Sequence, residues 1–132
     1  MRDYLALQMR TQDIEGISSL GLAYLGDAVY DLLVRSWLCE NGSMTSRRLH
    51  NETVRRVNAA AQARAFEKIH HLLSPEEEAV WRRGRNTKVN SVPARATVAQ
   101  YHAATGLEAL FGWLYLRGDR DRINELFSKM ID

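Results

Sequence analysis

The segment from Ser19 to Glu40 constrains this chain most, because it predicts a long helix that is apolar on nearly every side. Leu25, Val29 and Leu32 share one face at helical spacing, and the opposite face also carries apolar side chains. A helix of this kind is buried on more than one side, and one of those sides can belong to a partner subunit. The pair Asn41-Gly42 is a good signal for its C-terminal end.

The rest of the chain also predicts helices. Two prolines and eight glycines in 132 residues, with few alternating strand patterns, favour an all-α fold. The expected helices are one capped by Ser46, one from Asn58 to Ile69, one opened by Ser74-Pro75, one from Pro93 to Leu116, and one capped by Asp119. No linker or internal repeat interrupts them, so we expect residues 1–132 to form a single domain.

Composition excludes several classes of protein. Cys39 is the only cysteine, so neither an intramolecular disulfide nor a cysteine zinc cluster can form. The N-terminus has no apolar signal-peptide core. The most apolar stretches are interrupted by charges such as Asp31 and Glu108, well short of the roughly 20 residues that a membrane span needs. We therefore expect a soluble protein of the cytoplasm.

Two acids lie within apolar helical segments, Asp27 in the first and Glu108 in the last long one. A buried charge is costly unless it is paired, hydrogen-bonded or bound to a metal. One acid on each of two buried helices is a way in which helical bundles build metal sites, and Mg²⁺ commonly takes only one or two carboxylates. The alternative is that each acid is a structural salt-bridge or capping partner, and the pattern leaves both interpretations open.

Positive charge is concentrated in one window. The net charge is only +2, but residues 79–107 contain five cations and no acid. A polar loop is expected over 84–92, and the candidate phosphate-binding residues are Arg82, Arg83, Arg85, Asn86 and Lys88. A solvated charged turn is the alternative. A second group, Arg47, Arg48, Arg55 and Arg56, contains Glu52 and is explained equally well as a charged helical face.

Several motifs together resemble a known family. These motifs are Tyr24–Tyr30 (YLGDAVY), Ala61–Ala63 (AQA), Arg82–Asn86 (RRGRN) with Lys88, Ala104–Gly106 (ATG) and Glu108–Tyr115 (EALFGWLY). Their order and separation resemble the ribonuclease III catalytic domain, and within it the short Mini-III subfamily, which has no double-stranded RNA-binding domain.

The resemblance implies an all-α homodimer that cleaves double-stranded RNA with Mg²⁺, or with Mn²⁺. Asp27 and Glu108 match catalytic, metal-binding acids of the family. Two further acids of the classical pattern are replaced here by Ala23 and Thr105. The resemblance also implies maturation of precursor large-subunit ribosomal RNA, and it leaves open whether a large-subunit ribosomal protein takes part. The RNA would then be held by the surface of the catalytic dimer, with the Arg82–Lys88 segment as the leading candidate.

Two other classes of function remain as alternatives. A catalytically silent RNA-binding or ribosome-associated module could have the same fold, and the replacements at Ala23 and Thr105 keep this reading open. A plain helical dimerisation module with a charged loop is the third interpretation. It predicts no salt-sensitive affinity for RNA, whereas phosphate contacts predict affinity that falls steeply as salt rises.

Overall fold

The computed structural model describes residues 1–42, 45–88 and 96–131, and these ranges contain seven α-helices, one 3₁₀ helix and no strand. The all-α prediction is confirmed. Nowhere in these ranges does a helix combine the length and the apolar character needed to cross a membrane. In chain order the elements are α1 (Thr11–Glu15), α2 (Ser19–Glu40), α3 (Ser46–Arg56), α4 (Ala59–Glu67), η1 (His70–Leu72), α5 (Pro75–Arg85), α6 (Val98–Leu116) and α7 (Arg120–Met130).

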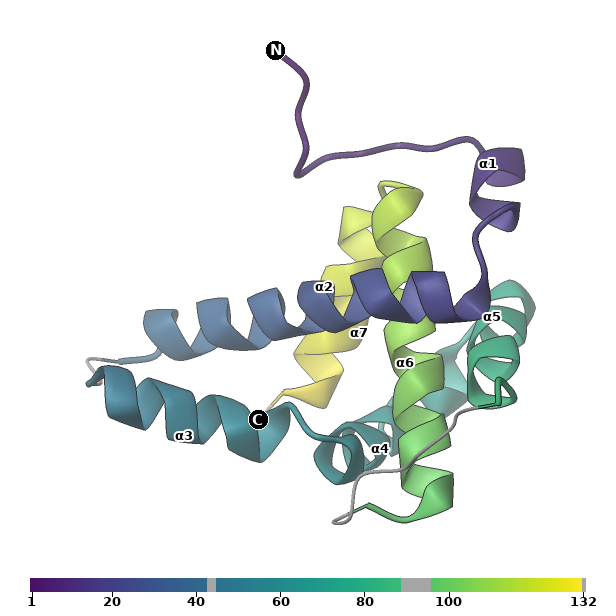
Figure 1. The fold of residues 1–132 in the computed structure, drawn as a ribbon. Helices are drawn as coiled ribbons and strands as arrows, with labels where there is room; N and C mark the ends of the chain where they lie inside the picture. The colour runs from purple at the N-terminus through teal and green to yellow at the C-terminus, as the bar shows by residue number, and fades with distance from the viewer. Residues whose placement is uncertain (43–44, 89–95, 132) are drawn as a thin grey trace.

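Helix α6 is the centre of the fold. It packs against α2, α4, α5 and α7, and Figure 1 shows α2 crossing it at a steep angle. From Ala104 to Leu114, every residue of α6 is buried except Glu108, which is half-buried. An element covered on so many sides must be apolar almost all round, as this one is. Glu108 is therefore the one charged group in the most buried stretch of the molecule.

Several helix ends lie where the local signals predict them. Helix α2 has the expected bounds, and the Ser18 hydroxyl accepts a hydrogen bond from the Gly21 amide at 3.0 Å. Ser74 and Glu77 form a capping box at the start of α5, and Asp119 caps α7. Such caps satisfy amide groups that have no partner within the helix. Short-range hydrogen bonding thus explains these ends.

Three predicted helix ends were wrong. Thr45 caps α3, so Ser46 is its first helical residue. Helix α6 begins at Val98, capped by Thr97 through a capping box, whereas Pro93 lies outside the described residues. Helix α4 ends at Glu67, before Ile69. At α3 and α6 a threonine side chain accepts a hydrogen bond from the amide three residues further on, that of Arg48 or of Gln100, and so fixes the start of the helix.

Burial on α2 is uneven between the two apolar faces that the sequence shows. Leu25 and Val29 are only half-buried, and Leu32 is 56% exposed. The buried residues are Leu22, Ala23, Gly26, Tyr30, Val34 and Leu38. This stripe is the more deeply buried one because it contains the small residues Ala23 and Gly26, which let the backbone of α2 approach α6 closely.

A buried ion pair connects α7 to α5. Arg122 donates to both carboxylate oxygens of Glu77 at 2.8 Å, and also to the carbonyl oxygen of Leu72 at 2.8 Å. Burial alone would raise the pKa of Glu77, but hydrogen bonds from Arg122 and from the Ser74 backbone hold it below its usual value. The pair fixes the position of α7 against α5 and so helps to keep α6 enclosed.

Candidate active site

Two glycines bring the backbones of α2 and α6 into contact. A Cβ atom on Gly26 would lie 1.6 Å from the carbonyl oxygen of Glu108, and one on Gly112 would lie 2.1 Å from that of Leu22. No side chain fits at such distances, so only glycine permits this crossing. Because Asp27 directly follows Gly26, the crossing places Asp27 beside Glu108.

The carboxyl groups of Asp27 and Glu108 lie side by side, close enough to influence each other's ionisation. Burial, followed by the hydrogen bond to Asp27 and its negative charge, raises the pKa of Glu108 to about 8. Near neutral pH, Glu108 therefore keeps its proton. Two carboxyl groups this close cannot both ionise easily unless a cation lies beside them.

Asp27 is exposed, although its sequence surroundings predict a carboxylate enclosed by apolar side chains. The reason is its place at the edge of the buried stripe of α2, next to Gly26. Glu108 is half-buried on α6. The pair is thus open to solvent on the Asp27 side and closed by protein on the Glu108 side. This arrangement lets a ligand reach the carboxyl groups from one direction.

Gln62 is a third member of the site to which the sequence assigned no role. It lies on α4, is only 4% exposed, and its amide Nε2 donates to Glu108 Oε2 at 3.5 Å. This contact lowers the pKa of Glu108 and opposes part of the effect of burial. The signal that could have found it is the Ala61–Ala63 motif, which places a polar side chain within the alanine-rich run of α4.

The positions of the two missing acids, Ala23 and Thr105, are both buried in the structure. Ala23 is buried, and the hydroxyl of buried Thr105 donates to the Tyr101 carbonyl oxygen at 3.0 Å within α6. Within the ranges that the structure describes, no group of three His, Cys, Asp or Glu side chains could hold a metal ion. Neither position can therefore replace the acid that the classical pattern places there.

The donor set suits a hard cation bound through few protein ligands. Asp27 and Glu108 supply carboxylate oxygens, and Mg²⁺ commonly uses one or two of these while keeping water or phosphate oxygens. The raised pKa of Glu108 reflects its burial first, and then the neighbouring carboxyl group of Asp27. The residues present thus fit one such ion, and a second ion held wholly by protein would lack ligands.

The predicted phosphate-binding residues lie at the end of α5 rather than in a loop from residue 84. Arg82, Arg83 and Arg85 occupy the last helical turn, and Asn86 is its C-cap. Arg82 is paired with Glu78, and Arg85 stacks over the Trp81 ring at 4.8 Å. Arg83 and Lys88 are exposed, and no ion pair involving them occurs among the described residues. Residues 89–95 of the expected loop lie outside the described residues.

The basic end of α5 is anchored on α6 near the acid pair. A Cβ atom on Gly84 would lie 2.9 Å from both the Gly106 Cα and the Ala109 Cβ, so the two helices touch there. Ala109 follows Glu108 in the chain, so the same stretch of α6 carries the acid and supports the cations. Cations at a helix C-terminus also stabilise the helix dipole, which remains a structural explanation for the three arginines.

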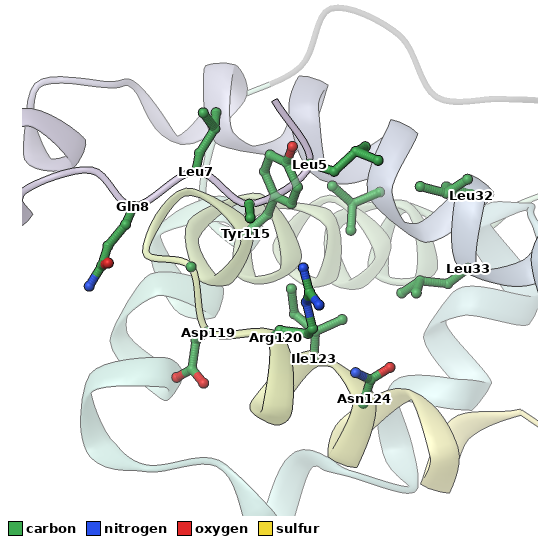
Figure 2. Close-up of a pocket in the computed structure, with 13 residues that line it drawn as sticks. Leu5, Leu7, Gln8, Leu32, Leu33, Tyr115, Asp119, Arg120, Ile123 and Asn124 are labelled. Atoms are coloured by element: carbon green, nitrogen blue, oxygen red, sulfur yellow. The ribbon is translucent and has the colours of Figure 1, made fainter. Parts of the chain in front are cut away.

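A larger cavity lies away from these groups. It has a volume of about 510 Å³, and Figure 2 shows that the side chains around it include Leu5, Leu32, Tyr115 and Ile123. Its lining is mostly apolar, and Asp119 is its only carboxylate. Size alone therefore does not identify the functional site, since this cavity has no pair of carboxyl groups.

Comparison with known families defines the class of the protein. Residues 20–119 match the family model described as the ribonuclease III domain. This stretch begins in α2 and ends just before α7, so it contains both acids, Gln62 and the basic end of α5. The protein is accordingly an endoribonuclease by class.

Individual relatives narrow the assignment. The chain is 43% identical to a Mini-ribonuclease 3 of Thermoanaerobacter sp., over 89% of this chain and 82% of the relative. It is 37% identical to a Mini-ribonuclease 3 of Clostridium tetani, over 100% and 89%. A crystal structure of a Fusobacterium nucleatum protein superposes with a TM-score of 0.80 at 33% identity, covering 88% of this chain and 93% of that one. The chain therefore belongs to the Mini-ribonuclease 3 branch of the ribonuclease III family.

Proposed function

We propose that this endoribonuclease cleaves double-stranded RNA with the help of a divalent metal ion, Mg²⁺ or Mn²⁺, and that residues 1–132 form one catalytic domain. The observation that carries the proposal is the carboxyl pair of Asp27 and Glu108, which is open to solvent on one side. Asp27 and Glu108 would hold the ion. When bound, the ion supplies a more acidic water and neutralises charge on the phosphate oxygens.

The protein's own groups have distinct tasks in this mechanism. Glu108 must first give up its proton, because only the ionised carboxylate is a good ligand. Gln62 assists by donating its amide hydrogen to Glu108, which favours the ionised form and fixes the orientation of the carboxylate. Buried Gly26 and Gly112 keep the two helices, and hence the two acids, in fixed positions.

The basic end of α5 would bind the RNA backbone. Arg83 and Lys88 are exposed and available, while Arg82, Arg85 and Asn86 lie beside them. The described part of this segment has no exposed aromatic side chain on which a base could stack, which favours phosphate contacts. A duplex in A-form is recognised mostly by its shape and backbone. These features support a double-stranded substrate over a single-stranded one.

We also propose a homodimer. Leu20 and Tyr24 are one helical turn apart on α2 and are 47% and 84% exposed, which is unusual for large apolar side chains. Both lie within two turns of Asp27, so a second subunit on this face would stand next to the acid pair. Sedimentation analysis of Tyr24→Glu tests this point. A dissociated variant is expected, and an unchanged dimer would contradict the use of this face.

The proposed biological substrate is precursor large-subunit ribosomal RNA, which would place the enzyme in the cytoplasm. Membership of the Mini-ribonuclease 3 branch supports this choice. The test compares cleavage of a duplex formed by the ends of the precursor with cleavage of an unrelated duplex of equal length. Both reactions use RNA and enzyme alone, so a requirement for a ribosomal protein would appear as failure to select the precursor.

The central experiment measures cleavage of a labelled RNA duplex by purified protein, with Mg²⁺ or with a chelator. Asp27→Asn and Glu108→Gln are expected to abolish cleavage while still binding the duplex. Asp31→Asn is the matched control, since Asp31 lies one turn further along α2 and pairs with Arg35. Full activity of either site variant would contradict the mechanism. A wild-type protein that binds the duplex but never cuts it would favour the silent RNA-binding module.

A further inference from the structure

A basic cavity lies close to the candidate active site. It has a volume of about 340 Å³ and is formed where the C-terminal parts of α3 and α7 meet α4. Figure 1 shows the C-terminal end of the chain beside α3 and α4. Among the residues that the structure describes, its lining contains four cations and no acid: Arg55, Arg56, Arg64 and Lys68, with Tyr30, Ala61, Ala65, Met130 and Ile131 completing the wall.

Within the described residues, the three guanidinium groups of this cavity outnumber the carboxylates that pair with them. Glu52 is shared by Arg55 at 3.2 Å and Arg56 at 3.0 Å, so one carboxylate serves two guanidinium groups. The hydrogen bond from Arg56 is the main reason that the pKa of Glu52 lies below its usual value. Arg64 is exposed and has no ion pair within the described ranges. Lys68 donates to the Met130 carbonyl oxygen at 3.3 Å.

The cavity lies next to the acid pair through two shared helices. On α2, Tyr30 in the cavity wall is three residues after Asp27, which is about 4.5 Å along the helix axis. On α4, Ala61 in the wall directly precedes Gln62, which contacts Glu108. A strand of RNA at the acid pair would therefore have neighbouring phosphates within reach of the cavity.

We propose that this cavity binds a backbone phosphate of the RNA, near the phosphate that is cleaved. This inference rests on the proposed function. It adds a second anchoring point for the RNA backbone, separate from the basic end of α5. Guanidinium groups bind phosphate oxygens through paired hydrogen bonds, and Arg55, Arg56 and Arg64 come from two different helices around one space. The small side chains of Ala61 and Ala65 leave room for the phosphate.

The chemistry of the wall favours a phosphate over a base. Tyr30 is the only aromatic residue of the lining, and it is 2% exposed, too little to stack on a base. Burial raises the pKa of Tyr30 to about 12, so its hydroxyl keeps its proton at neutral pH. Binding in this cavity is therefore independent of the RNA sequence and sensitive to salt.

The test measures affinity for an RNA duplex in the presence of a chelator, over a range of salt concentrations. Arg64→Gln is expected to bind about fivefold to tenfold more weakly at low salt and to lower the slope of log affinity against log salt by about one. Ala65→Glu, which adds a negative charge to the cavity, is expected to weaken binding further. Arg120→Gln is the matched control, because Arg120 is exposed at the opposite end of α7.

The outcomes separate this inference from the proposed function. If wild-type protein cleaves the duplex with Mg²⁺ but Arg64→Gln binds it as Arg120→Gln does, the cavity proposal is overturned and the nuclease proposal stands. If wild-type protein neither binds nor cleaves the duplex, both proposals fail. Circular dichroism melting verifies that each variant is folded, and Arg64→Gln decides the matter if Ala65→Glu is not.

Discussion

The backbones of Gly26 in α2 and Gly112 in α6 touch. A Cβ atom on Gly26 would lie 2.9 Å from the Gly112 amide nitrogen, and one on Gly112 would lie 3.1 Å from that of Gly26. This contact sets the distance between the two helices that carry Asp27 and Glu108. The chemistry of the acid pair therefore depends on two residues that have no side chain at all.

Substitution of Gly26 by alanine is expected to destabilise the fold severely. The added Cβ would meet the Glu108 carbonyl oxygen at 1.6 Å, which forces α2 and α6 apart. We expect a loss of about 3 kcal/mol or more in the free energy of unfolding, measured by chemical denaturation. Gly42→Ala is the control, because nothing lies within 4 Å of its Cβ position, and it should be neutral within about 1 kcal/mol. Equal stability of the two variants would contradict the backbone contact.

The stability of the metal-free protein should fall as the pH rises between about 4.5 and 8. The pKa of Glu108 is raised from 4.5 to about 8 on folding, so the folded chain binds more protons than the unfolded chain in this window. Stability linked to this group is complete below pH 4.5 and is lost as Glu108 ionises near pH 8. Glu108→Gln removes the linkage. The difference between wild type and variant should therefore change across the window, by on the order of 1–4 kcal/mol, in urea titrations.

Binding of Mg²⁺ should release protons at pH 7. The ion needs an ionised Glu108, whereas the metal-free site is mostly protonated because the pKa of Glu108 is about 8. Calorimetric titration in buffers of different ionisation enthalpy should show release of nearly one proton per ion at pH 7 and much less at pH 9. Asp31→Asn should behave as wild type. Proton release that does not depend on pH would show that Glu108 is not a ligand.

Gln62→Ala should lower metal affinity and cleavage rate while the protein stays folded. The amide of Gln62 lowers the pKa of Glu108, so its loss should raise that pKa further and make the carboxylate a poorer ligand. We expect about a 10–100-fold loss of metal affinity or of cleavage rate, with the pH profile moved upward. A merely structural role would lower stability and leave the pH profile in place, which distinguishes the two explanations.

Arg122→Met should destabilise the protein more than the loss of an exposed cation does. It leaves the Glu77 carboxylate buried without its partner, at a cost of about 3–5 kcal/mol. Arg10→Met breaks an ion pair whose two side chains are largely exposed and should cost less than about 1 kcal/mol. Thermal melting compares the two variants. The double variant Arg122→Met with Glu77→Gln should regain part of the loss, because no buried charge then remains.

Local sequence signals predicted where helices begin and end better than they predicted which side of a helix is buried. The bounds of α2 and the start of α5 follow from hydrogen bonds within a few residues, which the sequence contains in full. At α3 the cap is Thr45 and not the neighbouring Ser46, a choice that residue type alone does not make, and at α6 the cap is Thr97. Apolar residues occur all round α2, so periodicity indicated burial on more than one side and could not say which face is buried most deeply.

The sequence alone determined that the chain is helical, that it carries one acid on each of two apolar helices, and that its excess of positive charge lies in residues 79–107, which contain no acid. Those properties depend on residue type and on spacing along the chain. Only the tertiary structure decided that Asp27 lies beside Glu108, that Gln62 contacts Glu108, and that α3, α4 and α7 enclose a basic cavity. These relationships join residues far apart in the sequence, and packing of whole helices, rather than any local preference, brings them together.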